Sequence, residues 1–187
     1  DAITDLRVKR ALRLLVLALL TLLALQLYFL LRIAAMNWID PQSTTFQRSE
    51  MTRIVARDGR LAWSQQWVAL SAISANLPRA VIASEDGGFL EHHGIEWEAV
   101  EQAWSKNQRA EARAAQRKNG RRVAKVVGGS TITQQLAKNL FLSGERSMAR
   151  KAQEALLALS LEALLSKSRI LEIYLNHVEW GEGVFGA

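Results

Sequence analysis

Residues 128–140 read GGSTITQQLAKNL, and this segment indicates most directly how the chain folds. A glycine pair followed by Ser130 is typical of a loop that leads into a helix, with Ser130 as the N-cap. The helix is expected to run through Leu140. Its first backbone N–H groups would carry partial positive charge and bind phosphate readily. An ordinary glycine loop with a serine cap explains the pattern equally well.

Further helices are expected on both sides of this segment. One is predicted over residues 147–165, and Ser168 is expected to cap a last helix that includes an apolar core face. Upstream, Pro78 suits the first turn of a helix that ends near Glu85. Another helix is expected over residues 95–108. Together, these expected helices predict a mainly helical domain.

One small β-hairpin is expected at residues 52–68. Ile54 and Val55 precede the turn signal Asp58-Gly59, and apolar residues follow it. The glycine-rich tail at 181–186 is expected to be a loop. The predicted fold class is therefore mainly α with a small β-hairpin.

Residues 14–31 contain no charged side chain and predict a transmembrane helix. At about 1.5 Å per residue, 18 residues span roughly 27 Å, close to the hydrocarbon thickness of a bilayer. The apolar run leads into Arg32 rather than a small-residue cleavage site, which favours an uncleaved signal anchor over a signal peptide. Four bases precede the span and one follows it, so the tail at 1–13 is expected to be cytoplasmic. The expected organisation is a transmembrane anchor at 14–33 and an external domain at 38–187.

The chain has a formal net charge of +6 and contains no cysteine. A disulfide framework and a thiolate metal site are therefore excluded. The positive charge indicates an anionic partner, which could be nucleic acid, lipid headgroups or a phosphorylated substrate. The predicted external location disfavours nucleic acid. Residues 106–125 hold eight bases and one acid, which favours a solvated loop, with an electrostatic funnel for anionic lipid or pyrophosphate as the alternative.

Adjacent acids at Glu85 and Asp86 are the first candidates for chemistry. The glycines that follow and Phe89 indicate a tight approach beside an apolar wall, where desolvation would strengthen a carboxylate as a general base. Two solvated acids at a helix end are the alternative. His92 and its neighbour are expected to be structural, because no second cluster of ligands lies at a metal-binding spacing.

Two later segments supply hydrogen-bond donors and charges. Gln134, Gln135, Lys138 and Asn139 place amide and ammonium groups in the helix after the glycine loop. Arg150 and Glu154 form an i, i+4 pair, which would be either a surface ion pair of small energetic value or part of a phosphate-binding site.

Four segments in this order resemble the motifs of glycosyltransferase family 51, the peptidoglycan polymerases. They are residues 85–94 (EDxxFxxHxG), 129–139 (GSTITQQ followed by KN), 150–154 (RKxxE) and 167–176 (KxxILExYLN). Each motif alone is weak, but four in the correct order leave little room for coincidence. The resemblance covers about residues 50–187 and is strongest to the monofunctional members of the family.

The resemblance implies a lysozyme-like, mostly helical fold and inverting transfer between undecaprenyl-linked sugars. By this resemblance Glu85 is the general base that deprotonates the 4-hydroxyl of the acceptor's N-acetylglucosamine. Glu154 would assist at the donor side by stabilising positive charge or by helping to hold a divalent metal such as magnesium. The residues implied in substrate binding are Asp86, Phe89, His92, Ser130, Thr131, Gln134, Gln135, Lys138, Asn139, Arg150 and Lys151.

The implied partners are lipid II, the nascent glycan chain and the bacterial inner membrane, with other cell-wall synthesis proteins as further candidates. No organic cofactor is expected. The chain departs from the family at Glu96, where Asp is common, and it ends at Ala187, where family members continue, so a C-terminally truncated domain is expected. A transpeptidase domain farther along a natural chain stays open.

Two rival functions remain. One is a lysozyme-like lytic enzyme that cleaves glycan by acid-assisted chemistry and needs no pyrophosphate site. The other is a non-enzymatic, membrane-anchored basic scaffold, whose contacts with phosphate would be ionic and strongly salt-dependent.

Overall fold

The computed structural model of the chain describes residues 2–187 apart from 99–100, 103–104, 107, 110–128 and 146. The basic segment at 106–125 therefore lies largely outside the described residues, as does Gly128, and the helix expected over 95–108 is described only in part. The chain divides into two compact units, Asp1–Ile39 and Asp40–Ala187.

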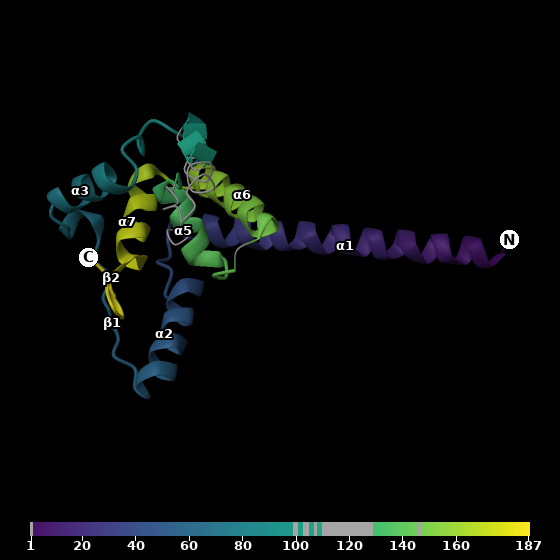
Figure 1. Cartoon of the computed structure of the whole chain (residues 1–187), viewed down its shortest axis with the longest axis horizontal. Coiled ribbons are helices and arrows are strands. Elements are labelled where there is room, and N and C mark those ends of the chain that lie inside the picture. Colours follow the sequence, from purple (N-terminus) through teal and green to yellow (C-terminus); the bar gives the residue numbers. More distant parts are fainter. Residues whose placement is uncertain (1, 99–100, 103–104, 107, 110–128, 146) are drawn as a thin grey trace, which may run out of the picture. The chain divides into compact units, whose positions relative to one another are not determined.

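The first unit is built on one long helix, α1 (Ala2–Ala35), shown as a continuous ribbon in Figure 1. Within it, Arg7–Ala35 is long and apolar enough to cross a membrane, with a mean hydropathy of 2.6 over its most apolar window. The polar Thr21 donates its hydroxyl to the Leu17 carbonyl at 2.8 Å, which satisfies the donor along the helix itself. The helix fits a single-pass membrane anchor.

The core of the second unit is formed by α5 (Ile132–Phe141), α6 (Met148–Leu164) and α7 (Lys167–His177). Figure 1 shows these helices together, and α5 packs against both of the others. Their facing side chains are fully buried and include Leu136, Leu140, Leu157, Leu161, Ile170 and Ile173. This confirms the predicted mainly helical class.

Hydroxyl side chains cap all three core helices, but both of the predicted caps, Ser130 and Ser168, are wrong. Ser147 caps α6, which begins where the helix was expected to begin. Thr131 rather than Ser130 caps α5, because Gln134 completes a reciprocal capping box with it. Ser166 rather than Ser168 caps α7 and accepts a hydrogen bond from the Arg169 backbone N–H.

The hairpin predicted at residues 52–68 is wrong, because its first half belongs to helix α2 (Thr45–Asp58). Thr44 and Gln47 form a capping box at the start of this helix. Gly59 ends it with a φ of 69°, the left-handed conformation that helix C-caps favour. The Asp58-Gly59 pair is therefore a helix stop rather than a hairpin turn.

The small hairpin lies instead in the tail, which was expected to be a loop. Strands β2 (Glu179–Gly181) and β3 (Val184–Phe185) pair antiparallel, and β1 (Ser64–Gln65) pairs parallel to β3. The three-stranded sheet has the order β1-β3-β2. Gly183 allows the turn because its φ is 70°.

Helix α3 (Asn76–Glu85) follows a short 3-10 turn, η1 (Leu70–Ala72), and ends at Glu85 as predicted. The loop after it contains Gly94 with a φ of 87°. A Cβ atom at this position would lie 2.9 Å from Glu162 Cγ and 3.1 Å from the Ala158 carbonyl oxygen. Glycine is therefore needed here for close packing of the loop on α6.

Candidate active site

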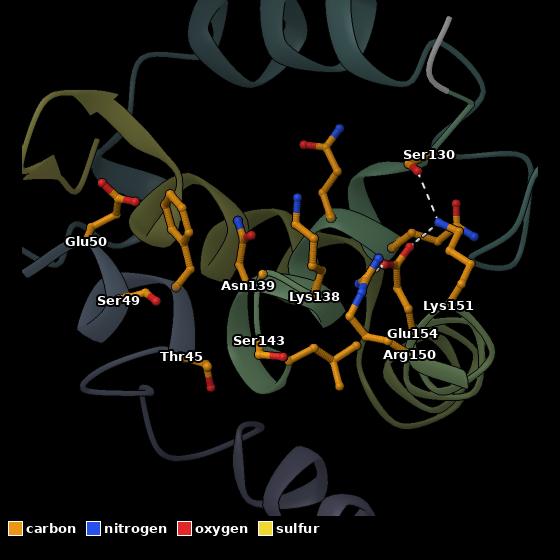
Figure 2. Close-up of a pocket in the computed structure, with 15 residues that line it drawn as sticks. Thr45, Ser49, Glu50, Ser130, Lys138, Asn139, Ser143, Arg150, Lys151 and Glu154 are labelled. Atoms are coloured by element: carbon orange, nitrogen blue, oxygen red, sulfur yellow. Dashed lines mark hydrogen bonds and ion pairs between the residues drawn. The ribbon is translucent and has the colours of Figure 1, made fainter. Parts of the chain in front are cut away.

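A polar hollow of about 440 Å³ lies between α2, α5 and α6 and is called the main hollow below. Figure 2 shows side chains from these three helices turned toward it. Its predicted lining residues are Ser130, Gln134, Gln135, Lys138, Asn139, Arg150, Lys151 and Glu154. The structure thus brings together residues from the second and third motifs.

Glu154 is buried at one end of the main hollow, where two cations bind its carboxylate. Arg150 Nη1 donates to Glu154 Oε2 at 2.8 Å, and Lys151 Nζ donates to Glu154 Oε1. The Glu154 side chain is 4% exposed, so this is not the surface ion pair that the sequence also allowed. Lys151 also donates to Ser130 Oγ at 3.3 Å, which ties α6 to the loop before α5 (Figure 2).

The main hollow carries more positive than negative charge. Its cations are Lys138, Arg150 and Lys151, against the carboxylates of Glu50 and Glu154. Lys138 is exposed and forms no ion pair among the described residues. Arg150 and Lys151 are both paired with Glu154. Among the described residues that line the main hollow, Lys138 is therefore the cation whose charge is not paired with an acid.

Glu85 lines a second, smaller hollow of about 170 Å³. Ser130 lines both hollows, so the two adjoin at this residue. Gln135, which lines the main hollow, donates from Nε2 to Glu85 Oε2 at 3.0 Å. The two predicted catalytic acids, Glu85 and Glu154, therefore lie in adjoining hollows that α5 joins.

The expected apolar wall beside Glu85 is absent from the described structure. Phe89 is fully buried in the core, and Glu85 itself is exposed. Lys167 Nζ lies 4.5 Å from the centre of the Phe89 ring and donates to the His92 carbonyl oxygen. Phe89 thus supports the loop from inside, and the desolvation predicted for Glu85 is wrong in this conformation.

Asp86 and His92 face inward and join the first motif to α5. His92 Nδ1 accepts a hydrogen bond from the Gly94 N–H at 3.1 Å, so Nε2 carries the proton and donates to Asp86 at 2.9 Å. Asp86 Oδ2 also accepts from the Ile132 N–H at 2.9 Å. These contacts are structural, and a role of either side chain in substrate binding stays a prediction.

Three of the N–H groups at the N-terminus of α5 are already bound within the protein, contrary to what the glycine loop suggested. Ile132 donates to Asp86, Thr131 N–H donates to Gln134 Oε1, and Gln134 N–H donates to Thr131 Oγ1. The hydroxyl of Thr131 donates to the Gly94 carbonyl oxygen at 2.6 Å. Thr131 and Gln134 are buried, and both position α5. Their N–H groups and that of Ile132 are therefore not available to bind a phosphate at this helix end.

Tyr174 of α7 lies behind Gln135, away from both hollows. Its hydroxyl donates to Gln135 Oε1 at 3.1 Å. Burial raises the pKa of Tyr174 to about 12, and the negative charges of Glu85 and Asp86 add to the rise. The sequence indicated only that this residue belongs to a core face.

The opposite side of the main hollow comes from α2, which the sequence did not place at the site. Thr45, Phe46, Ser49 and Glu50 line it there (Figure 2). Glu50 is paired with Arg53 at 2.6 Å. The capping signal at Thr44 and Gln47 would have revealed the helix, and the helix would then have placed these side chains on one face.

The residues around Glu154 do not fit a divalent metal. Both carboxylate oxygens are already bound by cationic side chains. Within the described ranges, no group of three His, Asp or Glu residues could hold a metal ion.

An exposed carboxylate can take a proton from a nucleophile, and a neighbouring hollow with excess positive charge can stabilise an anionic leaving group. The sequence matches the Transglycosylase family over residues 52–187, and the chain belongs to this family. This confirms the resemblance that the four motifs indicated.

Similar proteins carry the name biosynthetic peptidoglycan transglycosylase. The one from Bordetella pertussis is 53% identical over 148 residues, which cover 79% of this chain and 58% of that protein. The one from Janthinobacterium sp. is 47% identical over 174 residues, covering 93% of this chain and 70% of that protein. The one from Cupriavidus metallidurans is 51% identical over 167 residues, covering 87% and 65%. The chain thus spans about three fifths of the length of the Bordetella relatives.

Proposed function

We propose that the protein polymerises lipid II into glycan strands. Glu85 takes the proton from the 4-hydroxyl of the acceptor's N-acetylglucosamine, and that oxygen attacks the anomeric carbon of the donor's N-acetylmuramic acid. The new O–C bond forms as the bond from carbon to the pyrophosphate oxygen breaks, with inversion at carbon. Undecaprenyl pyrophosphate leaves with the bonding electron pair.

The placement of Glu85 is the observation that carries this proposal. An acid that is exposed at the edge of one hollow and joined through Gln135 to a cationic hollow has access to an incoming hydroxyl. Lys138 supplies positive charge for the leaving pyrophosphate, and Arg150 and Lys151 add to it while they hold Glu154. The names of the relatives agree with this reaction class.

The apolar helix α1 suits the proposed substrates. Lipid II and the growing strand are both confined to one membrane face, so an anchor keeps the enzyme at their surface. The bases before the span support a domain that lies outside the inner membrane, in the periplasm or its equivalent. Other cell-wall synthesis proteins are proposed as neighbours at that surface, and nucleic acid is not.

The test is a polymerisation assay with purified lipid II and the complete protein in detergent. Glu85→Gln is expected to lower turnover by at least 100-fold, because the amide keeps the shape but cannot accept the proton. Gln135 can still donate to the amide oxygen, so the fold is expected to stay intact.

Glu91→Gln is the matched control, because Glu91 is an exposed acid in the loop that follows α3. It is expected to polymerise normally. Normal turnover by Glu85→Gln would refute the assignment, and shortened glycan in place of polymer would indicate a lytic enzyme. The same assay with a chelator decides whether a divalent metal is required.

A further inference from the structure

Two hydrogen bonds in series connect three helices at the edge of the site. Tyr174 of α7 donates its hydroxyl to Gln135 Oε1 at 3.1 Å, and Gln135 of α5 donates Nε2 to Glu85 Oε2 at 3.0 Å. Glu85 is the last residue of α3. The order is therefore phenol, amide, carboxylate.

The chemistry of the three groups fixes the direction of this series. An ionised carboxylate only accepts hydrogen bonds, so the amide must turn Nε2 toward Glu85 and Oε1 toward Tyr174. Oε1 then needs a donor. Tyr174 provides one, because a phenol is protonated near neutral pH. Burial raises the pKa of Tyr174 further, to about 12.

We propose that Tyr174 is a positioning residue for Glu85 and acts through Gln135. The inference rests on the proposed function, in which Glu85 is the general base. Tyr174 is 2% exposed, so it does not touch the substrate and is not itself catalytic. It holds the amide, and the amide holds the carboxylate.

Positioning matters here because Glu85 has little else to hold it. The terminal torsion of a glutamate side chain is broad, and Glu85 is exposed at the C-terminal end of α3. Gln135 occupies Oε2, and Glu85 Oε1 has no hydrogen-bond partner among the described residues. Fixing one oxygen restricts the orientations of the other, and under the proposed function this raises the fraction of productive encounters with the acceptor's hydroxyl.

The first test is Tyr174→Phe in the complete protein, assayed with lipid II in detergent. The change removes only the hydroxyl and keeps the ring in the core. We expect kcat to fall about 3- to 10-fold, the loss of one neutral hydrogen bond, with KM changed less than 2-fold. Tyr28→Phe makes the same change at the chain's other tyrosine, in α1, and is expected to leave kcat unchanged.

The second test is the double-mutant cycle with Gln135→Ala. This variant removes both hydrogen bonds and is expected to lower kcat at least as much as Tyr174→Phe. In the Gln135→Ala background, Tyr174→Phe is expected to have no further effect on kcat, because the connection to Glu85 is already gone. A role of the hydroxyl that does not pass through Gln135 would lower kcat equally in both backgrounds.

The inference is overturned by normal kcat in Tyr174→Phe, by normal kcat in Gln135→Ala, or by additive losses in the cycle. Glu85→Gln separates this failure from that of the proposed function. An inactive Glu85→Gln beside a fully active Tyr174→Phe would overturn only the role of Tyr174. A fully active Glu85→Gln would overturn the role of the base and this inference with it.

Discussion

Replacing Asp86 by Asn tests whether this acid supports the site or binds substrate. Its side chain is 1% exposed and accepts hydrogen bonds from His92 Nε2 and from the Ile132 backbone N–H. Asparagine keeps one acceptor oxygen. Its amide nitrogen would be placed against one of the two existing donors, so one hydrogen bond is lost and two donors come into opposition.

The expected cost follows from the strength of these contacts. A hydrogen bond to a charged group contributes about 1.5–3 kcal/mol, and a buried donor without a partner adds a desolvation penalty. We therefore expect the free energy of unfolding to fall by about 2–4 kcal/mol. For a unit of this size, a fall of about 1 kcal/mol in the free energy of unfolding lowers Tm by roughly 2–4 °C. The Tm of Asp86→Asn is therefore expected to fall by roughly 5–15 °C.

Thermal unfolding of the complete protein in detergent, followed by circular dichroism, measures this change. Glu91→Gln is again the control, because it removes one exposed charge from the same loop and is expected to leave Tm unchanged. Loss of polymerisation by Asp86→Asn with an unchanged Tm would refute the reasoning and show that Asp86 acts on the substrate instead.

Two further substitutions test other parts of the site. Gly94→Ala is expected to lower stability by about 1–3 kcal/mol in a denaturant melt, because a Cβ would meet α6 and the φ of 87° disfavours alanine; an unchanged midpoint would contradict this. Arg150→Ala is expected to raise KM for lipid II about tenfold while costing about 1 kcal/mol of stability, because Lys151 still pairs with Glu154. An unchanged KM with a large fall in Tm would show that Arg150 only supports the fold.

The sequence predicts the core helices well because their signals are local. Hydroxyl residues and apolar spacing mark α6 and α7, and both ends of α6 and the start of α7 lie within a few residues of their predicted positions. The hairpin prediction fails for a local reason too. An Asp-Gly pair is compatible with a hairpin turn and with a helix C-cap, and only the capping box at Thr44 distinguishes them.

The site is predicted less completely, because a motif shows which residues occur together but not which way they face. Phe89 and Asp86 share a motif with Glu85, yet both are buried while Glu85 is exposed. The contacts that orient the site join residues far apart in sequence, such as Tyr174 with Gln135 and Asp86 with Ile132. No periodicity or spacing in a single sequence indicates such pairs.

In the arrangement around Glu154, one buried carboxylate holds two cations side by side. Arg150 and Lys151 are neighbours on α6, and without a carboxylate between them their charges would repel. Glu154 neutralises part of that charge and fixes both side chains. Arg has five N–H donors and Lys has three, so each retains donors for a phosphate oxygen. Under the proposed function, Glu154 thus keeps the cations in place for the departing pyrophosphate, and removing its carboxylate would disorder the donor side even where Lys138 remains.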